Sequence, residues 1–226
     1  MALEERIRHS MDVIRQADER YSDGFMTFSG GKDSTVLLDL VYGVNPGILI
    51  VSIDTGFEYE ETIKFINETV EKYSLNHIYI KPSEEDKQAI DRLYGDKFIF
   101  DGRYKCCEHK KPTMNKFLLK NNFSYWVTGL RREETPNRRN LSIVQDVTMP
   151  EANHLIISKI NPLALWKEGE IWLYIKENKL SYHPLYDKGF KSLGCKPCTD
   201  AGFREGRANQ GKFEEVGTSL ECGLHI

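Results

Sequence analysis

Four of the five cysteines in this 226-residue sequence form two close pairs, and their spacing indicates a metal site. Cys106 and Cys107 are adjacent, whereas Cys195 and Cys198 form a Cys-x-x-Cys pair further along the chain. Four thiolates are a common ligand set of structural zinc and of iron–sulfur clusters. Structural zinc sites usually space their ligands by two or more residues, so the adjacent pair favours a cluster and leaves zinc as the alternative.

The fifth cysteine, Cys222, lies in the run Glu221-Cys222-Gly223-Leu224-His225 near the C-terminus. An odd thiol beside a four-cysteine site has a separate role. The thiolate is the reactive form of cysteine and acts as a nucleophile. On physical grounds alone, however, a lone cysteine in a terminal segment is expected to be incidental.

A glycine-containing loop is the second feature that indicates chemistry. Phe25 to Phe28 read as a short buried strand, and the next six residues open a helix that runs to about Tyr42. Paired glycines let backbone N–H groups face an anion, and the helix N-terminus adds a partial positive charge. A lysine adds a full charge, and a serine caps the helix or binds a phosphate oxygen. The predicted phosphate loop consists of Ser29, Gly30, Gly31, Lys32, Asp33 and Ser34.

Arginines gather in two places that could bind a charged substrate. Guanidinium groups bind phosphate-like oxygens in a bidentate manner, which suits a phosphate or sulfate group. One group follows a predicted strand and the other follows the second cysteine pair; they comprise Arg131, Arg132, Arg138, Arg139, Arg204 and Arg207. A charge run is usually solvated, and we expect this for Arg131 and Arg132.

Alternating strands and helices must position these residues. Apolar runs at 48–53, 77–80, 125–129 and 155–160 read as strands, and helical patterns lie between them. Such alternation predicts a parallel sheet with right-handed crossovers, and hence a doubly wound, mostly parallel α/β fold. Ligands bind at the carboxyl ends of such strands. We therefore expect Ser29–Ser34, Asp54–Gly56 and Gly129–Arg139 to converge there.

Composition and charge narrow the class of protein. A net charge of −3 and a pI of about 6.1 predict no general attraction to nucleic acid or anionic membranes. The N-terminus reads as an amphipathic helix rather than a signal peptide, and no apolar run reaches the length of a membrane span. Closely spaced thiols without an export signal indicate a reducing, cytoplasmic location. We expect one domain over 1–226, with a core at about 20–160 and a cluster-binding, catalytic segment at about 161–226; a homo-oligomer is possible.

Several motifs resemble one enzyme family. The loop Ser29–Ser34 resembles the signature of the PP-loop superfamily, whose members bind adenine nucleotides. Residues 54–62 look like the second nucleotide-contact segment of its sulfonucleotide reductase branch. Residues 182–199 are similar to the motif of cluster-bearing adenylyl-sulfate (APS) reductases, and Glu221–His225 to the catalytic motif of the reductases for APS and for its 3′-phosphorylated form, PAPS. The matches run from about residue 24 to the end of the chain.

The resemblance implies a role for each candidate residue. The two cysteine pairs would ligate one [4Fe–4S] cluster, Cys222 would be the catalytic nucleophile, and His225 is a candidate to help form its thiolate. The loop would bind the nucleotide. The further substrate contacts would be Asp54, Lys111 (between cluster and substrate), Gly129, Arg139, Arg204 and Arg207, with Arg138 replacing Arg139 if the local alignment slips by one.

The implied reaction is reduction of APS to sulfite and AMP through an S-sulfocysteine on Cys222, which thioredoxin or a glutaredoxin-like thiol donor then releases. Four cluster cysteines favour APS over PAPS, and a PAPS or dual-specificity reductase is the alternative. Lys32 departs from the divergent loop of many bacterial reductases and keeps the form found in ATP-cleaving relatives. An ATP-dependent sulfur transferase acting on nucleic acid is therefore a further alternative. A third alternative is a redox-sensing iron–sulfur regulator. The sequence contains no recognisable DNA-reading element, which argues against it.

Overall fold

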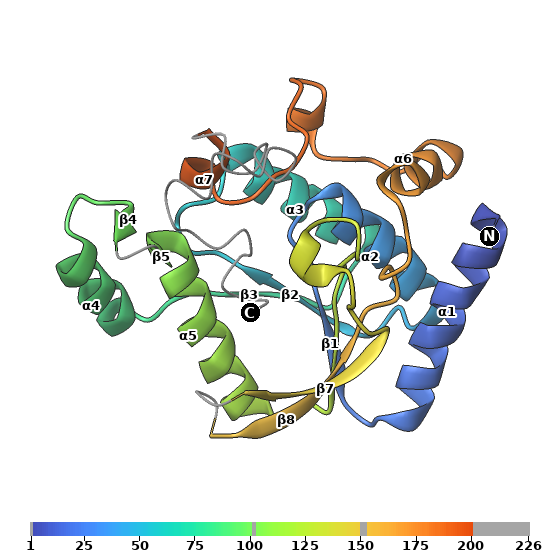
Figure 1. Cartoon of the computed structure of the whole chain (residues 1–226), viewed down its shortest axis with the longest axis horizontal. Coiled ribbons are helices and arrows are strands. Elements are labelled where there is room, and N and C mark those ends of the chain that lie inside the picture. The colour runs from blue at the N-terminus through green and yellow to red at the C-terminus, as the bar shows by residue number, and fades with distance from the viewer. Residues whose placement is uncertain (1, 101–102, 150–152, 201–226) are drawn as a thin grey trace.

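A six-stranded sheet forms the centre of the computed structural model, which describes residues 2–100, 103–149 and 153–200 (Figure 1). The strand order is β3-β2-β1-β6-β8-β7, and every neighbouring pair is parallel except β7 and β8. The strands are β1 (Gly24–Thr27), β2 (Leu49–Ile53), β3 (His77–Ile80), β6 (Tyr125–Val127), β7 (Val144–Met149) and β8 (Leu155–Ile160). The predicted doubly wound, mostly parallel α/β fold is confirmed.

Four helices cover one face of the sheet and share the larger apolar core. They are α1 (Leu3–Arg20), α2 (Lys32–Val44), α3 (Glu60–Tyr73) and α6 (Glu168–Glu177). Ile14, Leu37, Ile66 and Ile171 from these helices pack in a single buried cluster with Met26 and the neighbouring strand residues. Burial of these side chains holds α2 against the sheet, so the loop before α2 has a defined position.

The opposite face is covered mainly by α5 (Lys105–Asn121), beside which lies α4 (Glu84–Tyr94) (Figure 1). Met114 and Leu118 of α5 are fully buried against Phe25 and Trp126 of the strands. The rings of Phe25 and Trp126 stack with centroids 5.6 Å apart. This packing holds α5, whose first turn carries the first cysteine pair, against the sheet.

Some elements differ from the sequence predictions. Cys106 and Cys107 lie in the first turn of α5. The edge strand β7 was not predicted, because its residues alternate between exposed and half-buried positions and form no apolar run. The short hairpin of β4 (Ile99–Phe100) and β5 (Arg103–Tyr104) was not predicted either. None of the described helices has the length and apolar character needed to cross a bilayer.

Candidate active site

A cavity of about 180 Å³ lies at the carboxyl ends of the central strands. The parts of the chain that meet around it include the loop after β1, the segment after β6 and a segment that precedes the second cysteine pair, and residues from the loop after β2, α3 and α5 line it as well. The lining residues include Ser29, Gly31, Lys32, Asp33, Ser34, Gly129, Arg138, Tyr186, Ser192, Leu193 and Gly194. Loops that were expected to converge on this edge, the phosphate loop and the loop beginning at Gly129, therefore do so, as parallel strand polarity requires.

The phosphate loop has the geometry of an anion-binding turn. Gly30 has φ +73°, and a Cβ there would lie 3.3 Å from Cγ1 of Ile66, so a side chain would be both strained and crowded. The α2 helix begins directly after Gly31, and the hydroxyl of Ser34 donates to the Gly31 carbonyl oxygen at 2.9 Å. The N-terminal N–H groups of α2 therefore face the cavity side of the sheet.

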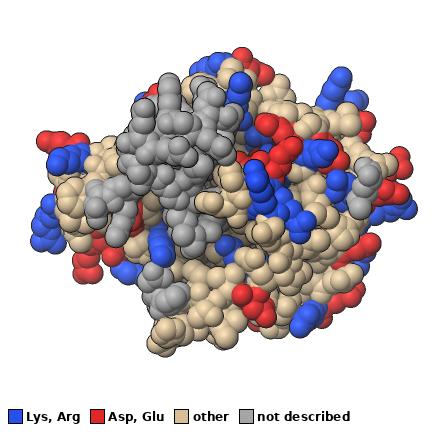
Figure 2. All heavy atoms as spheres, viewed as in Figure 1, with Lys and Arg blue, Asp and Glu red and all other residues tan. Residues whose placement is uncertain are grey.

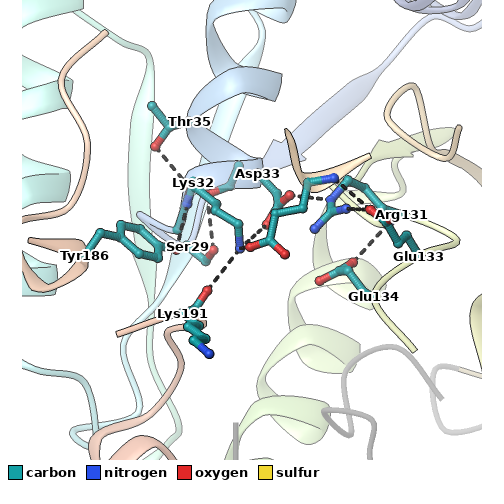
Figure 3. A network of polar contacts seen from close by, with 12 residues as sticks. Ser29, Lys32, Asp33, Thr35, Arg131, Glu133, Glu134, Tyr186 and Lys191 are labelled. Carbon is teal, nitrogen blue, oxygen red and sulfur yellow. Dashed lines mark hydrogen bonds and ion pairs between the residues drawn. The ribbon is translucent and has the colours of Figure 1, made fainter. Parts of the chain in front are cut away.

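Lys32 is buried, and its ammonium group already has partners within the chain (Figure 3). Its Nζ donates to the Lys191 carbonyl oxygen at 3.2 Å and lies 3.5 Å from Asp33 Oδ2 and 3.3 Å from Glu168 Oε1. The backbone N–H of Lys32 donates to the hydroxyl of Tyr186 at 3.0 Å. Both the main chain and the side chain of Lys32 thus contact the segment that leads to Cys195.

Arg131 corrects a prediction, because it is buried instead of solvated. Its side chain is 4% exposed, and its Nε donates to the carboxylate of Asp33, as Figure 3 shows. A buried guanidinium requires a charged partner, and the loop supplies it. Arg132 is also withdrawn from full exposure, with its Nε donating to the Leu141 carbonyl oxygen at 2.8 Å. These two arginines stabilise the loop after β6 and do not form a solvated charge run.

Arg138 and Arg139 have different positions at the end of the short helix η1 (Pro136–Arg138). Arg138 is buried, lines the cavity and pairs with Glu134 through its Nη1. Arg139 is exposed and is not among the residues that line the cavity. Of the two arginines, the alternative residue Arg138 is the one that the structure brings beside the phosphate loop.

Asp54 lies after β2 and contacts a lysine instead of the cavity that contains the loop. Its Oδ2 is 2.8 Å from Lys81 Nζ, and its Oδ1 accepts the Gly56 N–H at 3.0 Å. Partial burial opposes ionisation, but these two hydrogen bonds outweigh it and lower the pKa of Asp54 below its usual value. Asp54 therefore shapes the turn after β2 and is not in contact with Ser29–Ser34.

The four paired cysteines come together beside the cavity. Cys106, Cys195 and Cys198 are buried, Cys107 is half-buried, and all four pack in one cluster with Tyr104 and Phe57. The sulfur atoms of Cys106 and Cys198 are 3.6 Å apart without a disulfide. The hydrogen bond from Cys106, against the opposing effect of burial, lowers the pKa of Cys195 to about 6.

Hydrogen bonds to Cys107 and Cys195 raise the pKa of Cys106 above its usual value, so within this coupled pair the thiolate is favoured at Cys195. Close approach of the sulfur atoms is what a metal ligand set requires. Within the described ranges, no group of three or more His, Cys, Asp or Glu side chains converges on the position of a single metal ion. In a [4Fe–4S] cluster each cysteine binds a different iron atom, so its four sulfur atoms surround a larger group and need not share one point. In residue type and proximity, the four thiols therefore match the donor set of an iron–sulfur cluster or of a structural zinc site.

Glu58 and Lys110 connect the cysteines to the cavity, and neither was singled out from the sequence. Both line the cavity, with Lys110 Nζ 3.8 Å from Glu58 Oε1. The Cys195 sulfur lies 3.8 Å from the same carboxylate oxygen. Lys111, the predicted lysine at this place, is half-buried on α5 and does not line the cavity. The helical phase of α5 could have suggested Lys110, because it lies four residues after Cys106 and so on the same face.

Several predicted residues lie outside the described part of the chain. These are the nucleophile candidate and its neighbour together with two of the arginines: Cys222, His225, Arg204 and Arg207. Their assignments remain predictions from the sequence.

His183 predicts a measurable pH dependence of stability. It is 1% exposed; its Nδ1 accepts the Leu185 N–H, and its Nε2 lies 2.9 Å from the Thr62 hydroxyl. Burial lowers its pKa from 6.5 to about 4. The unfolded chain therefore binds a proton that the folded chain does not between about pH 6.5 and pH 4. Stability should fall by about 1–3 kcal/mol as the pH drops through this window, and should be unaffected by His183 above it.

Urea unfolding at pH 4.5, 5.5 and 7 measures this effect. His183→Gln should flatten the difference between the three pH values, because glutamine does not titrate. His154→Gln, which changes an exposed histidine, is the matched control and should keep the wild-type dependence. An equally steep fall in the His183 variant would show that other groups cause it.

Comparison with known proteins identifies relatives along almost the whole chain. A model of the phosphoadenosine phosphosulfate reductase domain matches residues 23–201. An adenosine 5′-phosphosulfate reductase from Geobacillus sp. (strain WCH70) is 33% identical over 219 residues, which cover 96% of this chain and 90% of that protein. An adenosine 5′-phosphosulfate reductase from Shouchella clausii is 34% identical over 221 residues, covering 96% and 88% respectively.

A solved structure shows the same fold. The phosphoadenylyl-sulfate reductase from Candida auris, in a phosphate complex, superposes with a TM-score of 0.69 at 23% identity. The superposition covers 84% of this chain and 89% of that one. At this level of identity the likeness shows the fold, and the closer sequence relatives show the family.

Proposed function

This chain belongs to the phosphoadenosine phosphosulfate reductase domain family, and we propose on that premise that it reduces adenosine 5′-phosphosulfate to sulfite and AMP. Relatives at 33% and 34% identity over nearly their full length bear the name of that activity. The observation that carries the proposal is the cavity, which the phosphate loop lines together with Glu58, whose carboxylate lies 3.8 Å from the sulfur atom of Cys195 in the four-cysteine group. The chain is accordingly an oxidoreductase that acts on a sulfur group.

The arrangement supports a defined placement of the substrate. Backbone N–H groups at the start of α2 suit its phosphate, and Gly129, just after β6, lies beside Asp33 and Ser34 at this helix start. The sulfate would extend towards Arg138 and the Glu58–Lys110 pair, which line the same cavity. Arg204 and Arg207 are proposed to complete the anion site from the C-terminal segment. The resemblance of the sequence alone supports three further substrate contacts, namely Asp54, Lys111 and Arg139.

The proposed reaction is a two-step group transfer. The Cys222 thiolate attacks the sulfur atom, an S–S bond forms, and the S–O bond to the phosphate breaks with its electron pair passing to AMP. A dithiol donor such as thioredoxin or a glutaredoxin-like protein then attacks Cys222 Sγ. The S–S bond to the sulfonate group breaks, sulfite leaves, and the donor is joined to Cys222 by a mixed disulfide. The second thiol of the donor then closes a disulfide within the donor and releases Cys222 as a thiolate, so the donor supplies the two electrons. Nucleophilic attack needs an unligated thiolate, and Cys222 is the one cysteine outside the two pairs.

Cys106, Cys107, Cys195 and Cys198 would hold a [4Fe–4S] cluster. When bound, the cluster would supply local charge and order to the substrate site. The Glu58–Lys110 pair would lie between this group and the cavity, where its charges contribute to substrate binding.

Further parts of the proposal concern organisation and surroundings. We propose one reductase domain over 1–226, because Ser192–Gly194, beyond the α/β core at about 20–160, line the same cavity as the phosphate loop. The close approach of the Cys106 and Cys198 sulfur atoms without a disulfide supports a reducing, cytoplasmic location. On the face in Figure 2, outside the grey atoms, basic and acidic side chains are interspersed, which does not favour a nucleic-acid substrate there. A homo-oligomer remains compatible with these features.

Substrate competition tests the proposed function. Anaerobically purified protein with thioredoxin should release sulfite from APS with a higher kcat/KM than from PAPS. Sulfite release should not depend on ATP. Arg138→Ala should weaken APS binding by about 1–3 kcal/mol, because a charge-assisted contact is lost. Arg139→Ala is the matched control and should have a smaller effect; Arg204→Ala and Arg207→Ala should resemble Arg138→Ala.

Each contrary outcome has a distinct meaning. A clear preference for PAPS would assign the chain to the phosphorylated substrate. Sulfur transfer to nucleic acid that requires ATP would replace the reductase function. A larger loss of APS affinity in Arg139→Ala than in Arg138→Ala would identify Arg139, the residue favoured by the sequence, as the substrate contact.

A further inference from the structure

The ammonium group of Lys32 is neutralised inside the protein, although a lysine in a phosphate loop is usually expected to bind phosphate. Its side chain is 6% exposed. Two carboxylates, those of Asp33 and Glu168, lie within 3.5 Å of Nζ. A substrate phosphate would have to compete for this positive charge with both carboxylates, of which Asp33 is largely buried and Glu168 is exposed. Loss of the buried partner is the costly part of that exchange.

Lys32 instead connects the phosphate loop to the segment 186–194. Its Nζ donates to the Lys191 carbonyl oxygen, and its backbone N–H donates to the Tyr186 hydroxyl at 3.0 Å. Nζ also lies 5.6 Å from the centre of the Tyr186 ring, within the range of a cation–π contact. The same ring is held edge-on by Trp172 of α6 at 5.1 Å, as part of the packing around this segment.

The segment that Lys32 contacts leads directly to the second cysteine pair. Ser192, Leu193 and Gly194 line the cavity, and Cys195 follows them. On its far side, the short helix α7 (Lys196–Asp200) is tied to the loop after β2 by the Lys196 N–H, which donates to the Phe57 carbonyl oxygen at 2.7 Å. The segment 186–194 is therefore tied to Lys32 at Tyr186 and Lys191, and the chain just beyond it is tied to the Phe57 loop through Lys196.

We propose that Lys32 is a positioning residue, which ties the phosphate loop to the segment 186–194 and so orders one wall of the cavity together with the second cysteine pair. In this role its ammonium group is not a ligand of the substrate phosphate, which the backbone N–H groups of the loop bind. The inference rests on the proposed function for the identity of the substrate. The contacts that carry it are independent of that function.

Hydrogen exchange of the segment 186–194 and affinity for AMP together test the proposal on the full chain, purified anaerobically. Lys32→Met removes the ammonium but keeps most of the side-chain length, whereas Tyr186→Phe removes only the hydroxyl that accepts the Lys32 N–H. Lys188→Met is the matched control, because this exposed lysine in the same segment pairs with Glu61 at the surface.

Lys32→Met should raise amide exchange in 186–194 by about tenfold or more, because the contacts that close the segment are lost, and Tyr186→Phe should raise it in the same peptide. The dissociation constant for AMP should change by less than about threefold. With APS, kcat should fall while KM stays nearly constant, as expected when binding is retained and alignment is lost. Lys188→Met should leave exchange, AMP affinity and kcat as in wild type.

Two results would overturn the proposal. One is unchanged exchange in 186–194 for both variants, whatever happens to AMP binding. The other is an AMP affinity or KM that weakens about tenfold in Lys32→Met while kcat is kept, which would make the ammonium a phosphate ligand. If the wild-type protein releases no sulfite from APS, the reductase function fails, but the exchange measurement still decides the role of Lys32.

Discussion

Cys222→Ser is expected to abolish sulfite formation while leaving nucleotide binding and iron content unchanged. The covalent intermediate must form on a thiolate, and a serine hydroxyl is a far weaker nucleophile at neutral pH. The four other cysteines are assigned to the cluster, and a metal-bound thiolate is poorly available for attack. Turnover should therefore fall to the background of the assay instead of by a modest factor.

Mass spectrometry can observe the intermediate directly. Wild-type protein mixed with APS, without a thiol donor, should gain one SO₃ group on the peptide that contains Cys222 and release about one equivalent of AMP. Sulfite should appear only after thioredoxin is added. The Ser variant should bind AMP as tightly as wild type, which controls for folding. An adduct on another cysteine, or full turnover by the variant, would remove Cys222 from the mechanism.

Loss of any one paired cysteine is expected to release the iron and, with it, most of the activity. Anaerobically purified wild type should contain about four iron and four sulfide per chain. Cys106→Ser and Cys198→Ser, whose parent sulfur atoms lie 3.6 Å apart, should each lose most of this iron, because a cluster of this type needs all four thiolates. Iron and sulfide assays and the visible absorption of the cluster measure the effect without reference to turnover.

The Cys222→Ser variant is the control for this experiment, since it removes a thiol without touching the paired set. It should keep its iron. Stoichiometric zinc without sulfide, in protein never exposed to oxygen, would contradict the cluster and support a structural zinc site instead. Full iron content in Cys106→Ser or Cys198→Ser would show that the two pairs do not bind one group.

The sequence alone was sufficient for features that depend on local physics. Strand β3 and strand β8 were predicted at the residues where they occur, because each is a short apolar run in the sequence. The phosphate loop was also predicted from a local pattern. Paired glycines before a helix fix the local backbone, and the observed φ of +73° at Gly30 is a conformation that glycine tolerates best.

The pairing of Cys106–Cys107 with Cys195–Cys198 was also predicted, but from residue type and resemblance and not from geometry. Their approach depends on the packing of α5 on the sheet and of α7 against the Phe57 loop, which no local pattern contains. The edge strand β7, by contrast, was not predicted. Its fold is decided by pairing with β8, and its own residues are too exposed to show an apolar pattern.

Only the tertiary structure decided what each charged side chain near the cavity contacts. Arg131 and Arg138 are buried and Arg139 is exposed, although all three lie in one basic loop. Likewise the partners of Lys32, Glu168 and Lys191, lie more than a hundred residues further along the chain. A charged residue is stable in the interior only where an opposite charge meets it, and the position of that partner is set by how distant segments pack. Sequence spacing therefore identified the residue types of the site, while the fold determined which of them face the cavity and which hold its walls.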